Sequence, residues 1–342
     1  MIELLTFDQA VAQSEGGKRH VLLGNGFSRA CRDDLFAYDA LFAQAQDNLS
    51  DSAKRAFEAL ETTDFEAVMR ALKQAVNLVE VYAPRSPKLA RRLAADAAKL
   101  REVLAQAIAS SHPDRPNDIR PAEFSACRTF LSHFNNIYTL NYDLLLYWAL
   151  MQSEVDDQTI NCNDGFHEPE DGPEEYVVWE VGDVGSQNVF YLHGALHVFD
   201  AGAEVQKYTW CNTGIALVDQ IRKALAENRY PIYVAEGSSG SKMQRIQHSA
   251  FLSRGFRSFA SISGSLFIFG HALADNDEHA LRLIERGTVR SVYVSIYGDP
   301  KNTDNRRIID RAEQFRDGRK KSRRRNKLDV KFLDAASAEV WG

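Results

Sequence analysis

The hydrophobic pattern divides the chain into short apolar runs separated by longer amphipathic stretches. Apolar runs at 20–23, 137–140, 189–192, 266–269, 289–296 and 330–333 have the length and composition of buried strands. Weaker β segments are predicted at 176–181, 207–210 and 232–235. Between many of these runs, apolar residues recur every three or four positions, as in amphipathic helices. The alternation predicts an α/β fold with a mostly parallel sheet and helices on both faces.

The stretch between the first and second strands has a different character. From about residue 33 to residue 111 it is rich in Ala, Leu, Glu, Lys and Arg, which favour helices. Pro84 and Pro87 interrupt the helical pattern. We therefore predict a helical insertion over 33–119 within a Rossmann-like domain built from 1–32 and 120–342.

Four of the predicted strands run into glycine or polar residues. Ligands of open α/β sheets bind at the carboxyl ends of the strands, so these residues predict one shared nucleotide site. They are the turn Gly24, Asn25, Gly26, Phe27 and Ser28 after the first strand, then Asn141 and Asp143, then His193 before Gly194, and finally Gly270 and His271 followed by Asp275 and Asp277.

Each motif also has a structural interpretation. The Gly24–Gly26 turn lacks the full dinucleotide-binding fingerprint and could be a plain strand-to-helix turn. Asn141 and Asp143 could cap a helix, and His193 could be a buried structural histidine. The acidic residues after Gly270 could cap a helix, contact a ribose or bind a metal. We disfavour the metal, because no second cluster has ligand spacing.

Composition narrows the functional classes further. The 342 residues carry a net charge of −6, so the whole molecule is not a general nucleic-acid binder. Four cysteines without a C-x-x-C pair argue against a zinc ribbon or a disulfide framework. With no signal pattern and no run of 18 apolar residues, we expect a cytoplasmic protein that does not enter membranes. The basic segment 316–327 is either a solvated loop or a surface for a polyanion or partner, which leaves nucleic-acid binding open.

Taken in order, the strand-end motifs resemble the sirtuin-like family. The match includes the turn at 24–28, Asn141 with Asp143, His193-Gly194, the segment 231–237 and the Gly270 turn with its aspartates. The zinc-binding cysteine quartet of deacylating sirtuins is absent, the helical block replaces their small cofactor-loop helices, and Thr139-Leu140 precedes Asn141. These departures resemble the divergent bacterial sirtuin-like proteins of anti-phage defence.

The resemblance implies an NAD glycohydrolase that releases nicotinamide and ADP-ribose without a metal. Asn141 would position the ribose and water, His193 would act as general base, and Asp143 would hold the carboxamide or its loop. It also implies a homo-oligomer and a partner such as a defence-associated ATPase. Alternatives are an inactive NAD or ADP-ribose sensor, a deacylase, and a nucleic-acid-binding or nuclease subunit. The implied NAD-binding residues are Gly24, Asn25, Gly26, Phe27 and Ser28 at the pyrophosphate, and Gly237, Ser238, Gly270, His271, Asp275 and Asp277 around the adenosine half.

Overall fold

A six-stranded parallel sheet forms the centre of the protein in the computed structural model. The structure describes residues 3–170, 172, 174–180, 186–209, 213–227, 229–234, 239–321 and 327–342. The spatial order is β11-β10-β9-β1-β2-β5, and every pairing is parallel. Counted along the chain, these six strands lie in the order 6-5-4-1-2-3, which is the doubly wound arrangement. The predicted fold class is therefore confirmed. The strands are β1 (Arg19–Leu23), β2 (Asn136–Thr139), β5 (Val189–Tyr191), β9 (Ser263–Phe269), β10 (Thr288–Ile296) and β11 (Asp329–Asp334).

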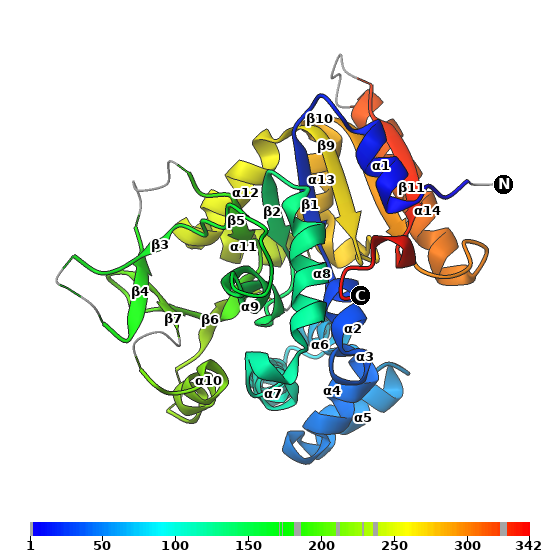
Figure 1. The fold of residues 1–342 in the computed structure, drawn as a ribbon. Coiled ribbons are helices and arrows are strands. Elements are labelled where there is room, and N and C mark those ends of the chain that lie inside the picture. The colour runs from blue at the N-terminus through cyan, green and yellow to red at the C-terminus, as the bar shows by residue number, and fades with distance from the viewer. Residues whose placement is uncertain are drawn as a thin grey trace.

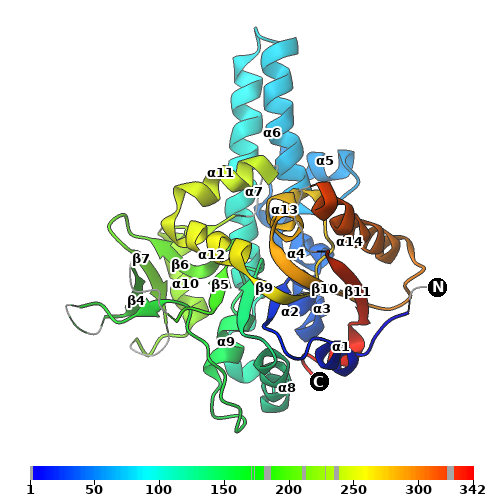
Figure 2. The same ribbon diagram turned by 90° about the horizontal axis from the view of Figure 1, so that it is seen from above.

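Helices cover both faces of this sheet, which explains why its strands are nearly continuous apolar runs. Helices α1 (Phe7–Gln13) and α8 (Pro121–Ser132) lie on one face (Figure 2). The other face carries α12 (Ala250–Ser261), α13 (Glu278–Arg286) and α14 (Thr303–Lys321). None of the helices in the described part of the chain is long and apolar enough to span a bilayer.

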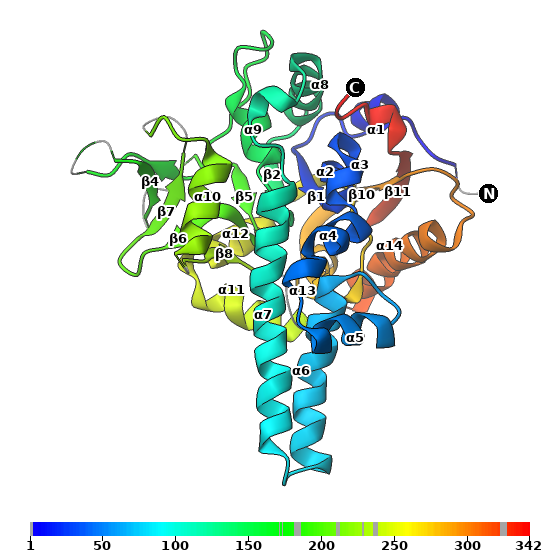
Figure 3. The same ribbon diagram turned by 90° about the horizontal axis from the view of Figure 1, so that it is seen from below.

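The predicted helical insertion lies beyond the carboxyl ends of the strands (Figure 1). It follows α2 (Asn25–Cys31), and its two long helices pack as an antiparallel hairpin. Figures 2 and 3 show this hairpin protruding from the body of the molecule. The other insertion helices lie around its base. The insertion comprises α3 (Asp33–Phe36), α4 (Tyr38–Ala45), the short η1 (Gln46–Asn48), α5 (Asp51–Ala59), α6 (Phe65–Tyr82) and α7 (Pro87–Ser111).

A second, antiparallel sheet was not predicted. Its order is β3-β4-β7-β6-β8. Residues 232–233 of the predicted strand at 232–235 fall in β8, which pairs antiparallel with β6 and does not join the parallel sheet. The pattern missed β6 because nearly all its residues are buried, so no alternation marks it. It also missed α9 (Leu145–Met151) and α10 (Leu217–Ala226). The strands are β3 (Phe166–His167), β4 (Tyr176–Trp179), β6 (Gly194–Asp200), β7 (Val205–Tyr208) and β8 (Pro231–Tyr233).

The described first half of the basic segment, residues 316–321, is helical and not a loop. Helix α14 continues to Lys321, and Arg319 on it is only 2% exposed. The Arg319 guanidinium donates hydrogen bonds to the backbone carbonyls of Ile284, Glu285 and Val289. Arg319 therefore joins α14 to α13 and β10. Residues 322–326 lie outside the described part of the chain.

Replacing Arg319 with methionine should lower the free energy of unfolding by about 3 kcal/mol, because three buried carbonyls lose a charged donor. Urea denaturation measures this change. The control is Lys320→Met, since the Lys320 side chain is 77% exposed and its loss should cost less than about 0.5 kcal/mol. Equal effects of the two substitutions would contradict an anchoring role for Arg319.

His112 joins the end of α7 to the start of α9 and makes stability depend on pH. Its Nε2 accepts a hydrogen bond from the Leu144 N–H, so the ring proton lies on Nδ1 and is donated to the Pro113 carbonyl. Burial of this neutral ring lowers the pKa of His112 to about 4. Because the unfolded chain binds the proton at higher pH, the stabilisation is present above about pH 6.5 and is lost as the pH falls towards 4.

Between pH 7 and pH 5, His112 should therefore contribute about 2 kcal/mol of stability loss. Other buried histidines titrate as well, so the wild type must be compared with His112→Gln, which removes only this contribution. Urea unfolding at the two pH values should show a smaller loss for the variant. An unchanged pH dependence would mean that His112 is not held neutral.

Candidate functional site

The predicted site residues lie at the ends of four neighbouring strands. Strands β9, β1, β2 and β5 are adjacent and parallel, so their carboxyl ends lie along one edge of the sheet. The chain order reverses between β1 and β9, which is where doubly wound sheets form their ligand crevice. The turns after β1 and β9 meet at this point.

Close approach of these two turns explains their glycines. A Cβ on Gly24 would lie 2.7 Å from the Gly270 carbonyl oxygen, and one on Gly26 would lie 2.6 Å from the Gly270 Cα. The Gly24 N–H donates to the Phe269 carbonyl at 2.9 Å, and the Gly26 N–H donates to the Gly270 carbonyl at 2.7 Å. These two N–H groups therefore bind the protein's own backbone and do not point at a phosphate here.

Ser28, Asn141 and Asp143 form one hydrogen-bonded group beside the first turn. The Asn141 amide donates to the Gly24 carbonyl at 2.9 Å and to Ser28 Oγ at 2.8 Å. The Ser28 hydroxyl in turn donates to Asp143 Oδ2, and the Leu145 N–H donates to Asp143 Oδ1. Burial raises the pKa of Asp143. The structure thus brings these three predicted residues together. Their hydrogen bonds also connect the segment after β1 to the segment after β2.

The side chains of Asn25 and Phe27 bind elsewhere in the protein. Asn25 donates to the carbonyl of Phe36 in the insertion. Phe27 is buried against Trp341, whose indole N–H donates to the Phe27 carbonyl. The sequence pattern did not distinguish these core contacts from contacts to a ligand.

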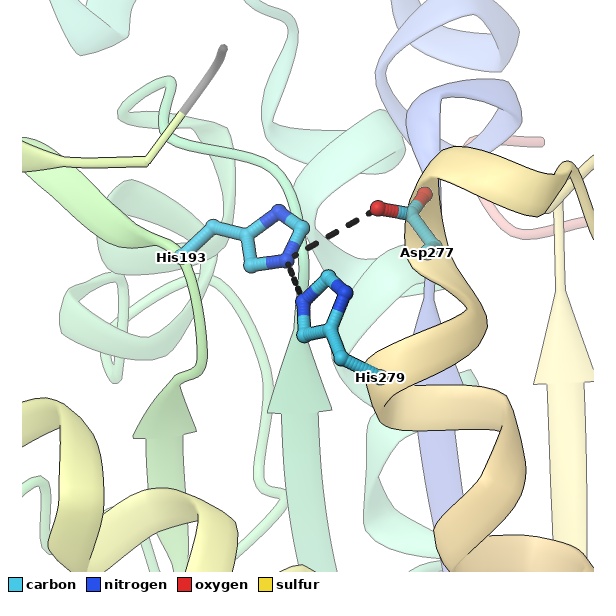
Figure 4. Close-up of side chains that lie close together, drawn as sticks. All are labelled: His193, Asp277 and His279. Carbon is cyan, nitrogen blue, oxygen red and sulfur yellow. Dashed lines mark hydrogen bonds and ion pairs between the residues drawn. The ribbon is translucent and has the colours of Figure 1, made fainter. Parts of the chain in front are cut away.

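His193 belongs to a second group, drawn in Figure 4. It follows β5, is 2% exposed, and its Nε2 lies 3.0 Å from Nε2 of His279 at the start of α13. Asp277 Oδ1 is 3.8 Å from the same nitrogen of His193. Gly194 has a φ of +80°, and a Cβ there would lie 1.9 Å from the Ile232 carbonyl oxygen. Position 194 therefore requires glycine because the backbones of β6 and β8 approach closely there.

Asp277 is held by two donors. Oδ2 accepts from His271 Nε2 at 3.0 Å, and Oδ1 accepts from Lys242 Nζ at 3.1 Å. The Leu273 N–H donates to Nδ1 of His271, which fixes the His271 proton on Nε2. Lys242, on α11 (Ser239–His248), is 1% exposed and also donates to Glu66 Oε2 at 2.7 Å. An ionic network thus connects the insertion to the strand ends.

Burial and charge set the protonation states in this network. Burial lowers the pKa of His193 well below its usual range, and the Lys242 charge lowers it further. Burial also lowers the pKa of His279 to about 4. Burial alone would raise the pKa of Asp277, but the His271 hydrogen bond and the Lys242 charge hold it well below its usual range. At neutral pH the imidazoles of His193 and His279 are neutral, and one of them can accept a proton.

Among the described residues, His193, Asp277 and His279 form a group that could hold a metal. Their ligand atoms all lie within 4.8 Å of one another, and two imidazoles with a carboxylate suit a zinc-like ion. However, the Lys242 ammonium already donates to the oxygen of Asp277 that would face the ion, and it would repel a second cation. We therefore interpret the group as a hydrogen-bonded network, and the absence of a required metal stays a prediction that metal analysis of purified protein can test.

Sequence comparison adds a family but no activity. A family profile described as a domain of unknown function, DUF4917, matches residues 21–341. The chain belongs to the DUF4917 family. Nothing among curated proteins matches it. The chemistry of this DUF4917 chain must therefore be argued from the geometry of its own residues.

Some site residues of the DUF4917 chain could not be found from its sequence. Lys242 and Glu66 had no motif, because the pair joins segments 176 residues apart. His279 follows Asp277 by two residues in the sequence, and only the fold shows that it contacts His193. Of the remaining predicted residues, Asp275 is exposed at the start of η3 (Asp275–Asp277). Gly237 and Ser238 lie outside the described residues.

Proposed function

We propose that this protein is a sirtuin-like NAD glycohydrolase that converts NAD and water into nicotinamide and ADP-ribose. The observation that carries the proposal is the placement of Asn141 and His193. They follow the adjacent strands β2 and β5 at the carboxyl edge, beside the point between β1 and β9 where the strand order reverses. A dinucleotide bound across that point would have its nicotinamide ribose near these two side chains.

The reaction needs little besides positioning and one proton acceptor. The bond between the pyridinium nitrogen and the ribose C1′ breaks, and its electron pair goes to nicotinamide. A water oxygen then bonds to C1′ and gives up a proton. Asn141 would hold the ribose and the water, and a neutral His193 would take the proton. Its lowered pKa keeps His193 unprotonated, although it also makes the imidazole a weaker base.

The test is incubation of the purified full-length chain with NAD, followed by chromatography for nicotinamide. Nicotinamide and ADP-ribose should appear in equal amounts. NAD should also fall in bacteria that express the chain, which covers the case in which cellular partners are needed. Intact NAD in both experiments would overturn the proposal.

A second candidate function is a sensor that binds NAD or ADP-ribose without cleaving it. The observation that favours it is the enclosure of His193, which is 2% exposed and bonded to His279. Titration calorimetry separates the two candidates. A sensor would bind NAD with a saturable signal and release no nicotinamide, whereas the glycohydrolase would turn it over.

A role in anti-phage defence, with an ATPase as partner, follows from the family resemblance and belongs to the same proposal. Phage plating on bacteria that carry the chain tests it. Protection that disappears in the His193→Ala variant would link defence to the proposed chemistry, and equal plating with and without the chain would argue against it.

A further inference from the structure

The tip of the α6–α7 hairpin exposes a group of large apolar side chains. Eight such side chains are exposed among the described residues, and four of them lie within residues 78–89. Val81 is 71% exposed and Tyr82 is 84% exposed. Leu78 precedes them on α6, and Leu89 lies in the first turn of α7. Exposed apolar groups of this kind commonly mark an interface.

The same tip is basic, although the protein is acidic. Between residues 78 and 93 there are four basic side chains, Arg85, Lys88, Arg91 and Arg92, and one acidic side chain, Glu80. The tip therefore has a net charge of +3. Because the whole chain has a net charge of −6, the rest of the chain has −9. Its partner should combine an apolar hollow with negative charge.

A hollow that combines two aromatic residues with a net negative charge lies at the other end of the hairpin. A cavity of about 690 Å³ opens between α4 and α5, with Phe42 and Phe57 in its wall. Asp39, Glu58 and Glu61 also line it, against the single cation Lys54. The cavity thus offers the two properties that the tip requires.

We propose that the tip (residues 78–92) binds the α4–α5 cavity of a second copy of this chain, in a symmetric dimer. The cavity residues Thr62 and Thr63 directly precede α6, and the tip follows its last turn. The two sites are thus about one α6 length apart, about 27 Å for 18 residues. Two hairpins lying side by side and antiparallel about a two-fold axis, overlapping along the length of α6, place each tip at the other's cavity.

The charges explain why the tip binds the cavity of the second copy and not the tip of the second copy. Two tips of +3 would repel each other, whereas the tip and the cavity carry opposite charges. The contact is reciprocal, so one interaction is made twice and the assembly closes at two copies. This inference does not depend on NAD cleavage.

Analytical ultracentrifugation over a range of protein concentrations tests the proposal. The wild type should form dimers that weaken as salt is added. Tyr82→Asp should raise the dissociation constant at least ~100-fold, as expected for a buried aromatic anchor. The matched control is Tyr297→Asp, because Tyr297 is 78% exposed and lies outside both surfaces. A monomer at every concentration, or equal effects of the two variants, would overturn the proposal.

Charge reversal identifies the contact directly. Arg85→Glu/Lys88→Glu should abolish dimers, and so should Glu58→Lys/Glu61→Lys, because each variant places like charges at both contacts. A mixture of the two variants should form heterodimers, since both contacts then pair opposite charges. Lys301→Glu/Arg306→Glu, at exposed residues outside both the tip and the cavity lining, should leave the wild-type dimer unchanged. Failure of the mixture to dimerise would exclude this pairing.

Discussion

Replacing His193 with alanine is expected to reduce nicotinamide release from NAD by about 10²–10⁴-fold, the usual contribution of a general base. Asn141→Ala should cause a loss of similar size, because the ribose and the attacking water would no longer be held. Both variants should still unfold cooperatively in urea. Single-turnover measurement of nicotinamide gives the rates.

The matched control for His193 is His248→Ala, an exposed histidine at the end of α11, which should leave the rate unchanged. If His193→Ala and Asn141→Ala both retained activity, the chemistry would have to lie elsewhere. Loss of activity together with loss of cooperative unfolding would instead show that the two residues hold the strand ends together.

Replacing Lys242 with methionine is expected to lower the free energy of unfolding by about 3–5 kcal/mol. The ammonium is almost fully buried between Glu66 and Asp277. Its removal leaves the Asp277 carboxylate, and the Glu66 carboxyl whose pKa burial raises to about 7, in the interior without their shared donor. Chemical denaturation at neutral pH measures the loss. Lys99→Met is the control, because Lys99 forms only a surface ion pair with Glu102 and should change stability by less than about 1 kcal/mol.

A double-mutant cycle identifies the partner of Lys242. Glu66→Gln in the Lys242→Met background should cost less than it does alone, because the neutral amide no longer needs a counter-ion. Purely additive effects of the two substitutions would mean that the contact between α11 and α6 contributes no coupling energy.

The parallel sheet could be predicted from the sequence because its strands are local signals. Each is a short apolar run that ends in glycine or a polar residue, and β1, β2, β5 and β9 were all found in this way. The weaker β segments predicted at 176–181, 207–210 and 232–235 overlap β4, β7 and β8 of the antiparallel sheet. The sheet itself could not be predicted, because β6 is buried along most of its length and lacks alternation. The residues predicted for the site also make different contacts. Asn141 donates a hydrogen bond to Ser28, whereas Phe27 packs against Trp341 in the core.

The rest of the site depends on contacts between distant segments. Glu66 stands in the first turn of α6, where an acidic residue ordinarily complements the helix dipole. Only the folded chain shows that it contacts Lys242 and Asn276. The glycines after β1 illustrate the same limit, because the sequence predicts pyrophosphate binding there but could not show that Gly24 and Gly26 also pack against the backbone of Gly270.

Helix α6 places Glu66 in the buried network and Tyr82 at its far, exposed end. A helix transmits displacement along its axis like a stiff rod. A partner bound at Tyr82 would therefore contact one end of α6, and the other end of the same helix carries Glu66, which pairs with Lys242. Deleting the hairpin would therefore also remove the carboxyl group that accepts a hydrogen bond from the buried Lys242.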